Sequence, residues 1–195
     1  MKSKFIVIEG PDRVGKATQV KLLQEKLAKA NKTVTTVEVP LRSNIIYHLI
    51  YWMLGNGLAK KFPKIFQWFQ YFNRQIFQWM ILPGLDDEYD YIIMDRWSLS
   101  TVVYGAATGV PEEFTQKLYK RLKIPDHTII LLGKSHQHVA EDVYESDNSL
   151  QEKVRKLYAI WSEKNQDCSS VIECSQPREV VFSQIINALS NAKLM

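Results

Sequence analysis

The segment Gly10-Pro-Asp-Arg-Val-Gly15-Lys16 restricts the possible fold more than any other part of the sequence. It follows the apolar run Phe5–Glu9, which predicts a strand, and it precedes a segment whose apolar residues recur at helical spacing. The two glycines let the backbone turn tightly with its N–H groups around phosphate oxygens, and Lys16 adds a positive charge. This arrangement predicts a nucleoside triphosphate site with phosphoryl transfer as its chemistry. The residues expected to bind the triphosphate are Gly10, Arg13, Val14, Gly15, Lys16, Ala17 and Thr18.

Further apolar runs alternate with segments of helical spacing along the chain. The five runs that predict strands are Phe5–Glu9, Thr33–Val39, Tyr91–Met94, His127–Leu132 and Ser170–Cys174. Several are apolar throughout, as are strands buried on both faces of a parallel sheet. Strands that alternate with helices indicate βαβ units, so we expect a three-layer α/β/α fold around a parallel five-stranded sheet. A length of 195 residues suits a single domain over 1–195.

One residue departs from the usual phosphate loop. The position after the lysine normally carries a Ser or Thr whose hydroxyl binds Mg²⁺, but here it is Ala17. Thr18 lies about 100° further round the helix, so it does not simply replace that hydroxyl. Asp95 follows the strand Tyr91–Met94, where an acid suits either a metal held through water or a helix N-cap. Either Mg²⁺ is held through water and Asp95, or phosphoryl transfer is impaired.

Charged residues at the predicted strand ends indicate a second anion site. Asp12 lies inside the loop, where a negative charge beside a polyphosphate needs a cationic partner or a substrate hydroxyl. Arg13 beside it can stabilise charge on the transferred group, as an arginine supplied in cis does. We expect Arg42, Arg74 and Arg96 to form a clamp for a second phosphate, although a surface ion pair is the simpler interpretation of each one alone.

Several segments together resemble the thymidylate kinase family, in the subtype with an arginine inside the phosphate loop. The matching segments are Phe5–Gln19, Pro40-Leu-Arg42-Ser, Asn73-Arg74, Asp95-Arg96-Trp97 with Ser100, Pro125-Asp126, and Val143-Tyr144-Glu145. The resemblance implies a P-loop nucleoside monophosphate kinase fold with a short lid over about 134–145. It also implies ATP and Mg²⁺ as cofactors, and phosphorylation of dTMP to dTDP in nucleotide biosynthesis.

The resemblance implies roles for individual residues as well. Lys16 and Arg13 would bind the ATP phosphates, and Asp12 would meet the 3′-hydroxyl of the acceptor sugar. The residues implied to bind the acceptor are Asp12, Arg42, Phe69, Arg74, Arg96, Tyr104 and Tyr144. Those implied to act in catalysis are Asp12, Arg13, Lys16 and Arg96.

Departures from the family pattern concentrate on base recognition. Gln70 stands four residues before Arg74, where the family has a base-stacking phenylalanine, and Trp97 replaces the usual tyrosine. The segment after Asp95-Arg96 lacks the family's polar base-reading side chain. The alternatives are therefore a kinase of other (deoxy)nucleosides or nucleoside monophosphates, or a nucleotide-binding kinase-like protein whose catalysis is impaired by Ala17.

An aromatic-rich segment at about 62–82 predicts a helix with two apolar ridges. One ridge suffices for a core, so we expect the other to pack against a second copy in a homodimer, which the resemblance also favours. A wholly buried helix is the alternative interpretation.

Charge and composition restrict the other partners. A net charge of +4 without a basic cluster argues against a nucleic-acid binder. The most apolar stretch, 45–54, is too short to cross a membrane. Cys168 and Cys174 fit no disulfide framework, and the sequence opens without a secretory leader, so we expect a cytoplasmic protein.

Overall fold

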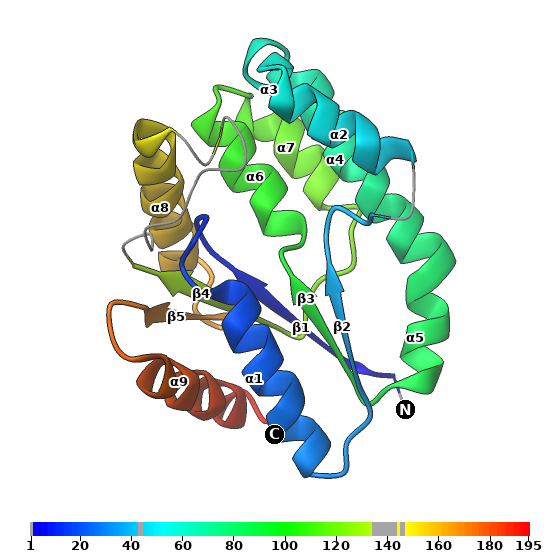
Figure 1. Ribbon diagram of the computed structural model, residues 1–195, viewed down its shortest axis with the longest axis vertical. Helices are drawn as coiled ribbons and strands as arrows, with labels where there is room; N and C mark the ends of the chain where they lie inside the picture. The colour runs from blue at the N-terminus through cyan, green and yellow to red at the C-terminus, as the bar shows by residue number, and fades with distance from the viewer. Residues whose placement is uncertain (1, 43–44, 134–143, 145–146) are drawn as a thin grey trace.

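The computed structural model describes residues 2–42, 45–133, 144 and 147–195 (Figure 1). Its centre is a sheet of five parallel strands in the order β2-β3-β1-β4-β5. The strands are β1 (Lys4–Glu9), β2 (Val34–Glu38), β3 (Tyr91–Asp95), β4 (His127–Leu132) and β5 (Ser169–Glu173). Each strand lies where the sequence predicts it, so the parallel five-stranded sheet is confirmed.

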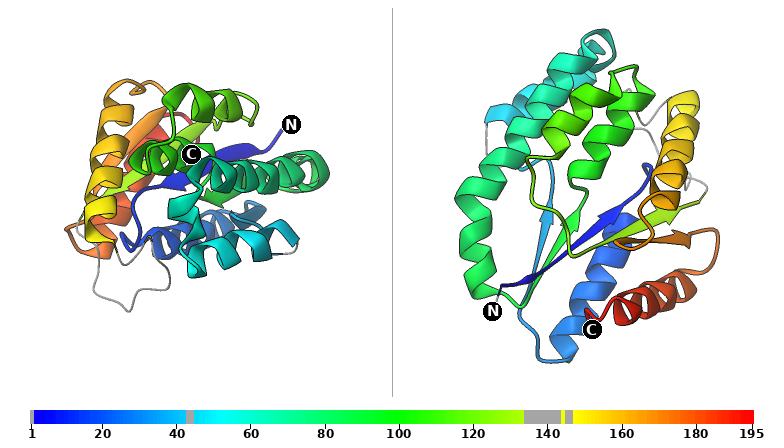
Figure 2. Two further views of the ribbon diagram at one scale, coloured as in Figure 1. Left: turned by 90° about the horizontal axis from the view of Figure 1, so that it is seen from above. Right: turned by 180° about the vertical axis from the view of Figure 1, so that it is seen from behind.

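Helices cover both faces of this sheet and complete the three predicted layers (Figure 2). The helices are α1 (Lys16–Lys29), α2 (Ile45–Gly55), α3 (Leu58–Lys61), α4 (Pro63–Ile76), α5 (Leu82–Glu88), α6 (Ser98–Ala107), α7 (Glu112–Tyr119), α8 (Asn148–Glu163) and α9 (Arg178–Asn191). Helices α1 and α9 pack on one face, and α4, α6 and α8 lie over the other. The lid expected over about 134–145 lies outside the described residues, apart from Tyr144.

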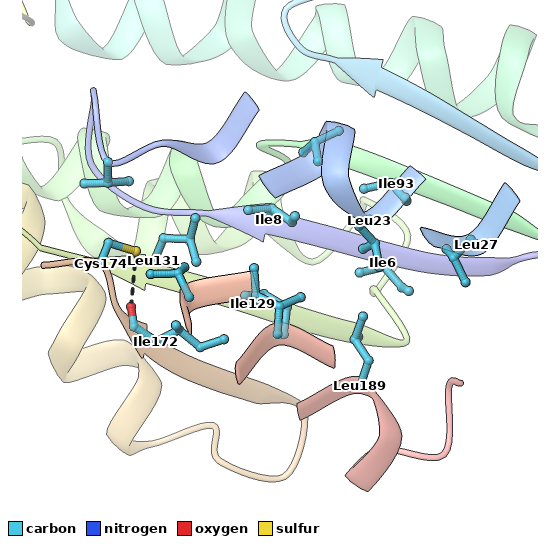
Figure 3. Packing of buried hydrophobic residues seen from close by; sticks show 14 of the residues in the cluster. Ile6, Ile8, Leu23, Leu27, Ile93, Ile129, Leu131, Ile172, Cys174 and Leu189 are labelled. Carbon is cyan, nitrogen blue, oxygen red and sulfur yellow. Dashed lines mark hydrogen bonds between the residues drawn. The ribbon is translucent and has the colours of Figure 1, made fainter. Parts of the chain in front are cut away.

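The central strand β1 supplies side chains to both layers of the core. Ile6 and Ile8 pack toward α1 and α9, where Leu23 and Leu189 meet them (Figure 3). Phe5 and Val7, which alternate with them, point into the opposite layer. These four residues of β1 are at most 1% exposed, which explains why the strand is apolar at every position between Lys4 and Glu9.

The aromatic segment forms α4, followed by a π-helical turn (Phe77–Ile81) and then α5. Phe77 is fully buried and meets Trp97 edge-on, with ring centroids 5.6 Å apart. Phe5 approaches the same indole at the same centroid distance, so Trp97 joins the π-helical turn after α4 to the sheet. No helix in the described part of the chain has the length and apolarity needed to cross a bilayer.

Candidate active site

A cavity of about 430 Å³ lies at the carboxyl ends of β2 and β3, between the phosphate loop and helices α4 and α6. This is the edge at which open α/β sheets bind ligands. Because Ile8 pairs with Asp95 in the β1–β3 register, the loop after β1 and the acid at the end of β3 share this edge. The predicted site residues that line the cavity are Asp12, Arg13, Gly15, Lys16, Ala17, Thr18, Arg74, Asp95, Arg96, Tyr104 and Tyr144.

Backbone geometry explains the glycines of the phosphate loop. Gly10 has φ 144°, and a Cβ added there would lie 2.3 Å from the Leu131 carbonyl oxygen. Gly15 has φ 90° and is the N-cap of α1. Because glycine has no side chain, nothing at this position separates the first turn of the helix from the cavity. Gly10 and Val14 shape the loop and do not line the cavity; Val14 is buried in the core beneath it. A helix N-terminus of this form attracts phosphate.

Lys16, at the start of α1, is buried in the cavity wall. Its Nζ donates a hydrogen bond to the Pro11 carbonyl at 2.6 Å. Burial, and after it the charge of Arg96, lowers the pKa of Lys16 to about 8, although three nearby carboxylates act in the opposite direction. A buried ammonium group in this position would be stabilised by an anion beside it.

Asp12 is the centre of a polar network inside the loop. Its carboxylate forms an ion pair with Arg96 and accepts hydrogen bonds from Tyr104 Oη and Gln151 Nε2, each at 2.7 Å. Burial alone would raise its pKa, but Arg96 and then Lys16, helped by the two hydrogen bonds, leave the pKa of Asp12 below its ordinary value. Asp12 therefore remains ionised at neutral pH, and the cationic partner expected from the sequence is Arg96.

Arg96 links the phosphate loop to the start of α6. Its backbone is left-handed, with φ 68°, and its guanidinium donates to the Gly10 carbonyl at 3.0 Å. The guanidinium carbon also lies 5.3 Å from the centroid of the Tyr104 ring. Burial disfavours its charge, but Tyr104 and Asp12 outweigh that effect and raise the pKa of Arg96 well above its ordinary value.

Arg74, on α4, is 2% exposed and lines the same cavity. Its Nε donates to the Trp97 carbonyl at 2.9 Å, and its Nη1 donates to the carbonyl and Oε1 of Gln70 at 3.0 and 2.8 Å. Among the described residues it has no carboxylate partner within ion-pair distance. Burial lowers the pKa of Arg74 to about 10, although the charge of Glu9 acts in the opposite direction from beyond ion-pair distance. A buried cation with neutral partners beside a cavity is suited to bind an anion.

The structure does not bring Arg42 to the other two arginines. The Arg42 side chain is 73% exposed, and its Nη2 donates to Glu38 Oε2 at 3.2 Å. This is the surface ion pair that is the simpler interpretation of an isolated arginine. In the described structure, the predicted clamp therefore consists of Arg74 and Arg96.

Phe69 does not line the cavity either. It is partly buried and packs with the residues that join α2, α6 and α8. Helix α4 instead presents Gln67, Gln70 and Arg74 to the cavity, because these positions follow one helical ridge and Phe69 lies about 100° away from Gln70.

Asp95 lies at the cavity wall, and burial raises its pKa even though Lys16 and Arg96 act in the opposite direction. It is not the N-cap of α6: Trp97 holds that position, and the backbone N–H groups of Trp97 and Ser100 bind Glu9. The described residues contain no cluster of three or more His, Cys, Asp or Glu side chains suited to a metal ion. One carboxylate beside a phosphate loop still fits Mg²⁺, which keeps several waters and binds substrate phosphates.

Two residues that the sequence analysis missed support the site. Glu9 is fully buried and accepts hydrogen bonds from Trp97 N at 2.8 Å, Ser100 Oγ at 2.6 Å and Tyr158 Oη at 2.9 Å. The sequence feature that could have identified Glu9 is its position as an acid at the end of an apolar strand, directly before the phosphate loop. Gln151 carried no such signal, because its partner Asp12 is 139 residues away in the sequence.

Two tyrosines form the wall of the cavity beside Asp12. The rings of Tyr104 and Tyr144 stack at a centroid distance of 6.0 Å with 19° between their planes. Phe66 meets Tyr144 edge-on at 5.6 Å. The cavity thus combines a phosphate loop, two buried arginines and an ionised carboxylate that can accept a hydrogen bond from a hydroxyl group. Such a site can position a polyphosphate and an anionic acceptor for transfer, with little covalent work by the protein.

Comparisons with known proteins agree on one family. A family model described as thymidylate kinase matches residues 8–185. A thymidylate kinase of Neorickettsia sennetsu is 31% identical to this chain, over 72% of this chain and 71% of the relative. The thymidylate kinase of Schizosaccharomyces pombe is 26% identical, over 99% of this chain and 94% of the relative. The solved structure of thymidylate kinase from Candida albicans has a TM-score of 0.80 at 24% identity, covering 99% of this chain and 93% of that one.

Proposed function

The chain belongs to the thymidylate kinase family and phosphorylates dTMP to dTDP; we propose that it does so in the cavity beside Lys16, with ATP as the donor. The observation that carries this assignment of the site is the burial of Arg74 beside the phosphate loop without a carboxylate partner in the described structure. A phosphate loop alone accounts for the binding of one anion, the donor. A second buried cation on α4 supports an acceptor that is itself a phosphate.

The donor would bind at the start of α1. Backbone N–H groups after Gly15 and the ammonium group of Lys16 would contact the ATP phosphates, with Lys16 Nζ leaving the Pro11 carbonyl to reach them. Arg13, which also lines the cavity, would stabilise the charge that develops on the transferred group.

The acceptor would bind between α4 and α6. Arg74 and Arg96 would hold the dTMP phosphate, and Asp12 would accept a hydrogen bond from the 3′-hydroxyl. Support for the last role comes from the lowered pKa of Asp12, since an ionised carboxylate is an acceptor only. Tyr104 and Tyr144 would lie beside the deoxyribose.

Mg²⁺ would be held by Asp95 through water and by the donor phosphates. Bound there, the ion would neutralise charge on the phosphates during transfer.

Ala17 supplies no hydroxyl for the Mg²⁺ ion, and this observation favours a second candidate, a kinase-like protein that binds nucleotide with impaired transfer. An ADP-release assay with ATP and dTMP separates the two: steady release supports the kinase, and nucleotide binding without release supports the second candidate. If Ala17→Ser raises the rate, the missing hydroxyl limits the wild-type enzyme.

The outer ridge of α4 supports a homodimer. Ile65, Trp68 and Phe72 follow one face of this helix and are between 38% and 50% exposed, and Trp79 beyond them is 71% exposed. Trp68 and Phe72 stack at 5.3 Å. Apolar surface of this extent suits contact with a second copy of the chain.

The cellular location belongs to the same proposal. Both cysteines are free thiols, Cys174 buried and Cys168 partly so. Free thiols are usual in a reducing compartment, so we place the enzyme in the cytoplasm.

A further inference from the structure

The start of α1 offers no side-chain oxygen at the position where a phosphate loop normally binds its metal ion. Ala17 follows Lys16, and it is exposed at the cavity wall. Thr18 also lines the cavity, but it lies about 100° further round the helix. A Mg²⁺ ion that enters this cavity with ATP must therefore find its side-chain contacts on other elements.

Two carboxylates at neighbouring strand ends line the same cavity. Glu38 ends β2 and Asp95 ends β3, and the two residues are direct partners in the parallel register (Figure 1). Adjacent strands lie about 4.8 Å apart, and residues paired in register point to the same face of a sheet. Asp12, a third acid at the cavity wall, is already committed to its ion pair with Arg96. Glu38 and Asp95 therefore form a pair of acids at this edge.

The Asp95 carboxylate has no hydrogen-bond donor and no cation within ion-pair distance among the residues that the structure describes. It is partly buried at the cavity wall. Buried polar groups in folded proteins are nearly all paired, so this carboxylate indicates a partner that enters with the ligand. Because the group is an acid, a suitable partner is a cation.

Glu38 has an exposed partner instead. Its Oε2 accepts a hydrogen bond from Arg42 Nη2 at 3.2 Å, and the two side chains are 59% and 73% exposed. An exposed ion pair of this kind contributes little to stability, and it leaves the second carboxylate oxygen for another contact. Mg²⁺ suits such a position because it keeps several of its waters, so a carboxylate at the rim of the cavity can hold it through water.

The charges around the cavity also favour a cation at these strand ends. In the proposed function, the ATP phosphates lie beside Lys16, and the acceptor phosphate lies beside Arg74 and Arg96. Negative charges on Glu38 and Asp95 would repel these phosphates. A divalent cation between the carboxylates and the phosphates removes this repulsion.

We infer that Glu38 is a second carboxylate that holds the Mg²⁺ ion of the bound nucleotide, in place of the hydroxyl that Ala17 lacks. The inference rests on the proposed function, since it requires ATP at the start of α1. Glu38 and Asp95 hold the ion through water from β2 and β3, and the phosphates supply the remaining oxygen ligands. Ala17 is then compatible with full phosphoryl transfer.

The test measures metal affinity directly, with Mn²⁺ as the probe. Mn²⁺ is titrated by electron paramagnetic resonance into enzyme that is in excess over a non-hydrolysable ATP analogue, without acceptor. We expect Glu38→Gln to weaken Mn²⁺ binding roughly 10-fold or more, as is typical when a residue around a metal is removed. Glu173→Gln is the matched control and should stay within about twofold of the wild type. Glu173 ends β5 at the same edge of the sheet, outside the cavity, and binds Ser175.

Two further variants separate metal binding from the surface ion pair. Ala17→Ser restores the usual hydroxyl, so in its presence Glu38→Gln should weaken Mn²⁺ binding by about threefold or less. Arg42→Gln breaks the same ion pair but keeps the Glu38 carboxylate, and it should not weaken Mn²⁺ binding.

Three results would overturn the inference about Glu38. They are a Mn²⁺ affinity of Glu38→Gln within about twofold of the wild type, an equal loss with Ala17→Ser present, and an equal loss in Arg42→Gln. A wild-type enzyme that does not bind the ATP analogue would instead contradict the proposed function.

Discussion

The side chain of Gln151, on α8, holds Asp12 by two hydrogen bonds. Its Oε1 accepts the Asp12 backbone N–H at 3.1 Å, and its Nε2 donates to Asp12 Oδ2 at 2.7 Å. The same nitrogen donates to the Tyr144 carbonyl at 3.1 Å. One amide therefore joins the phosphate loop, α8 and Tyr144, which belongs to the range predicted as the lid, and it fixes the orientation of the carboxylate proposed to meet the acceptor sugar.

Gln151→Leu should weaken acceptor binding more than donor binding. Loss of a hydrogen bond to a charged group costs about 1.5–3 kcal/mol, so we expect kcat/KM for dTMP to fall roughly 10- to 100-fold. Steady-state kinetics with each substrate varied in turn will measure this, and Gln116→Leu on the exposed side of α7 is the matched control. Equal losses for ATP and dTMP would argue against a role through Asp12.

ATP binding should take up protons near pH 8. In the enzyme without ATP, the pKa of Lys16 is lowered to about 8, so at pH 8 this side chain is neutral in part of the molecules. Bound phosphates favour the charged form, so Lys16 in these molecules must gain a proton when ATP binds. Affinity should therefore be constant below about pH 7 and fall by up to about tenfold per pH unit above pH 8. Calorimetry at pH 8 in two buffers of different ionisation enthalpy measures the uptake. Lys16→Arg, which stays charged, should lack it; equal uptake in both proteins would contradict the assignment.

Glu9→Gln should destabilise the fold. The fully buried Glu9 accepts hydrogen bonds from the start of α6 and from Tyr158, and an amide nitrogen in place of one oxygen would face these donors. We expect a loss of about 2 kcal/mol, seen as a Tm lower by about 4–8 °C. Glu38→Gln, an acid at the end of β2 with an exposed partner, should change Tm by less than about 2 °C. An unchanged Tm for Glu9→Gln would show that the cap of α6 contributes little.

Phe72→Glu should separate the proposed dimer. A charge in the centre of an apolar interface typically costs on the order of 2 kcal/mol or more in binding, since it must be desolvated. Light scattering at micromolar concentration should give a dimer mass for the wild type and a monomer mass for the variant. Val180→Glu, an exposed apolar position on α9 across the sheet, should remain dimeric. A monomeric wild-type protein would rule the interface out.

The fold could be predicted because its signals are local. Strands β1 and β4 contain unbroken apolar runs, Phe5 to Ile8 and Ile129 to Leu132. The glycines of the loop at 10 and 15 have the positive φ values that their residue type suggests. The outer ridge of α4 could also be identified, since helical periodicity separates Phe72 from the buried Phe66 and Phe77.

The site could be predicted only in part, because its contacts join distant segments. Lys16, Asp12 and Arg96 lie within or next to recognisable motifs, and the cavity brings them together. Arg42 lies within a matching segment too, but its place on the surface beside Glu38 depends on the path of the chain after β2. The Gln151 contact depends on how α8 packs, which local sequence does not encode.

In the proposed reaction, the ATP γ-phosphoryl group is transferred to dTMP while Lys16 and Arg13 bind the ATP phosphates. The most direct measurement is chromatographic separation of the products after ATP and dTMP are incubated with the wild-type enzyme, Lys16→Ala and Arg13→Ala. We predict equal amounts of ADP and dTDP from the wild type, and rates lower by roughly 10³-fold or more in both variants. Absence of dTDP with the wild-type enzyme, or full rates in both variants, would contradict the account.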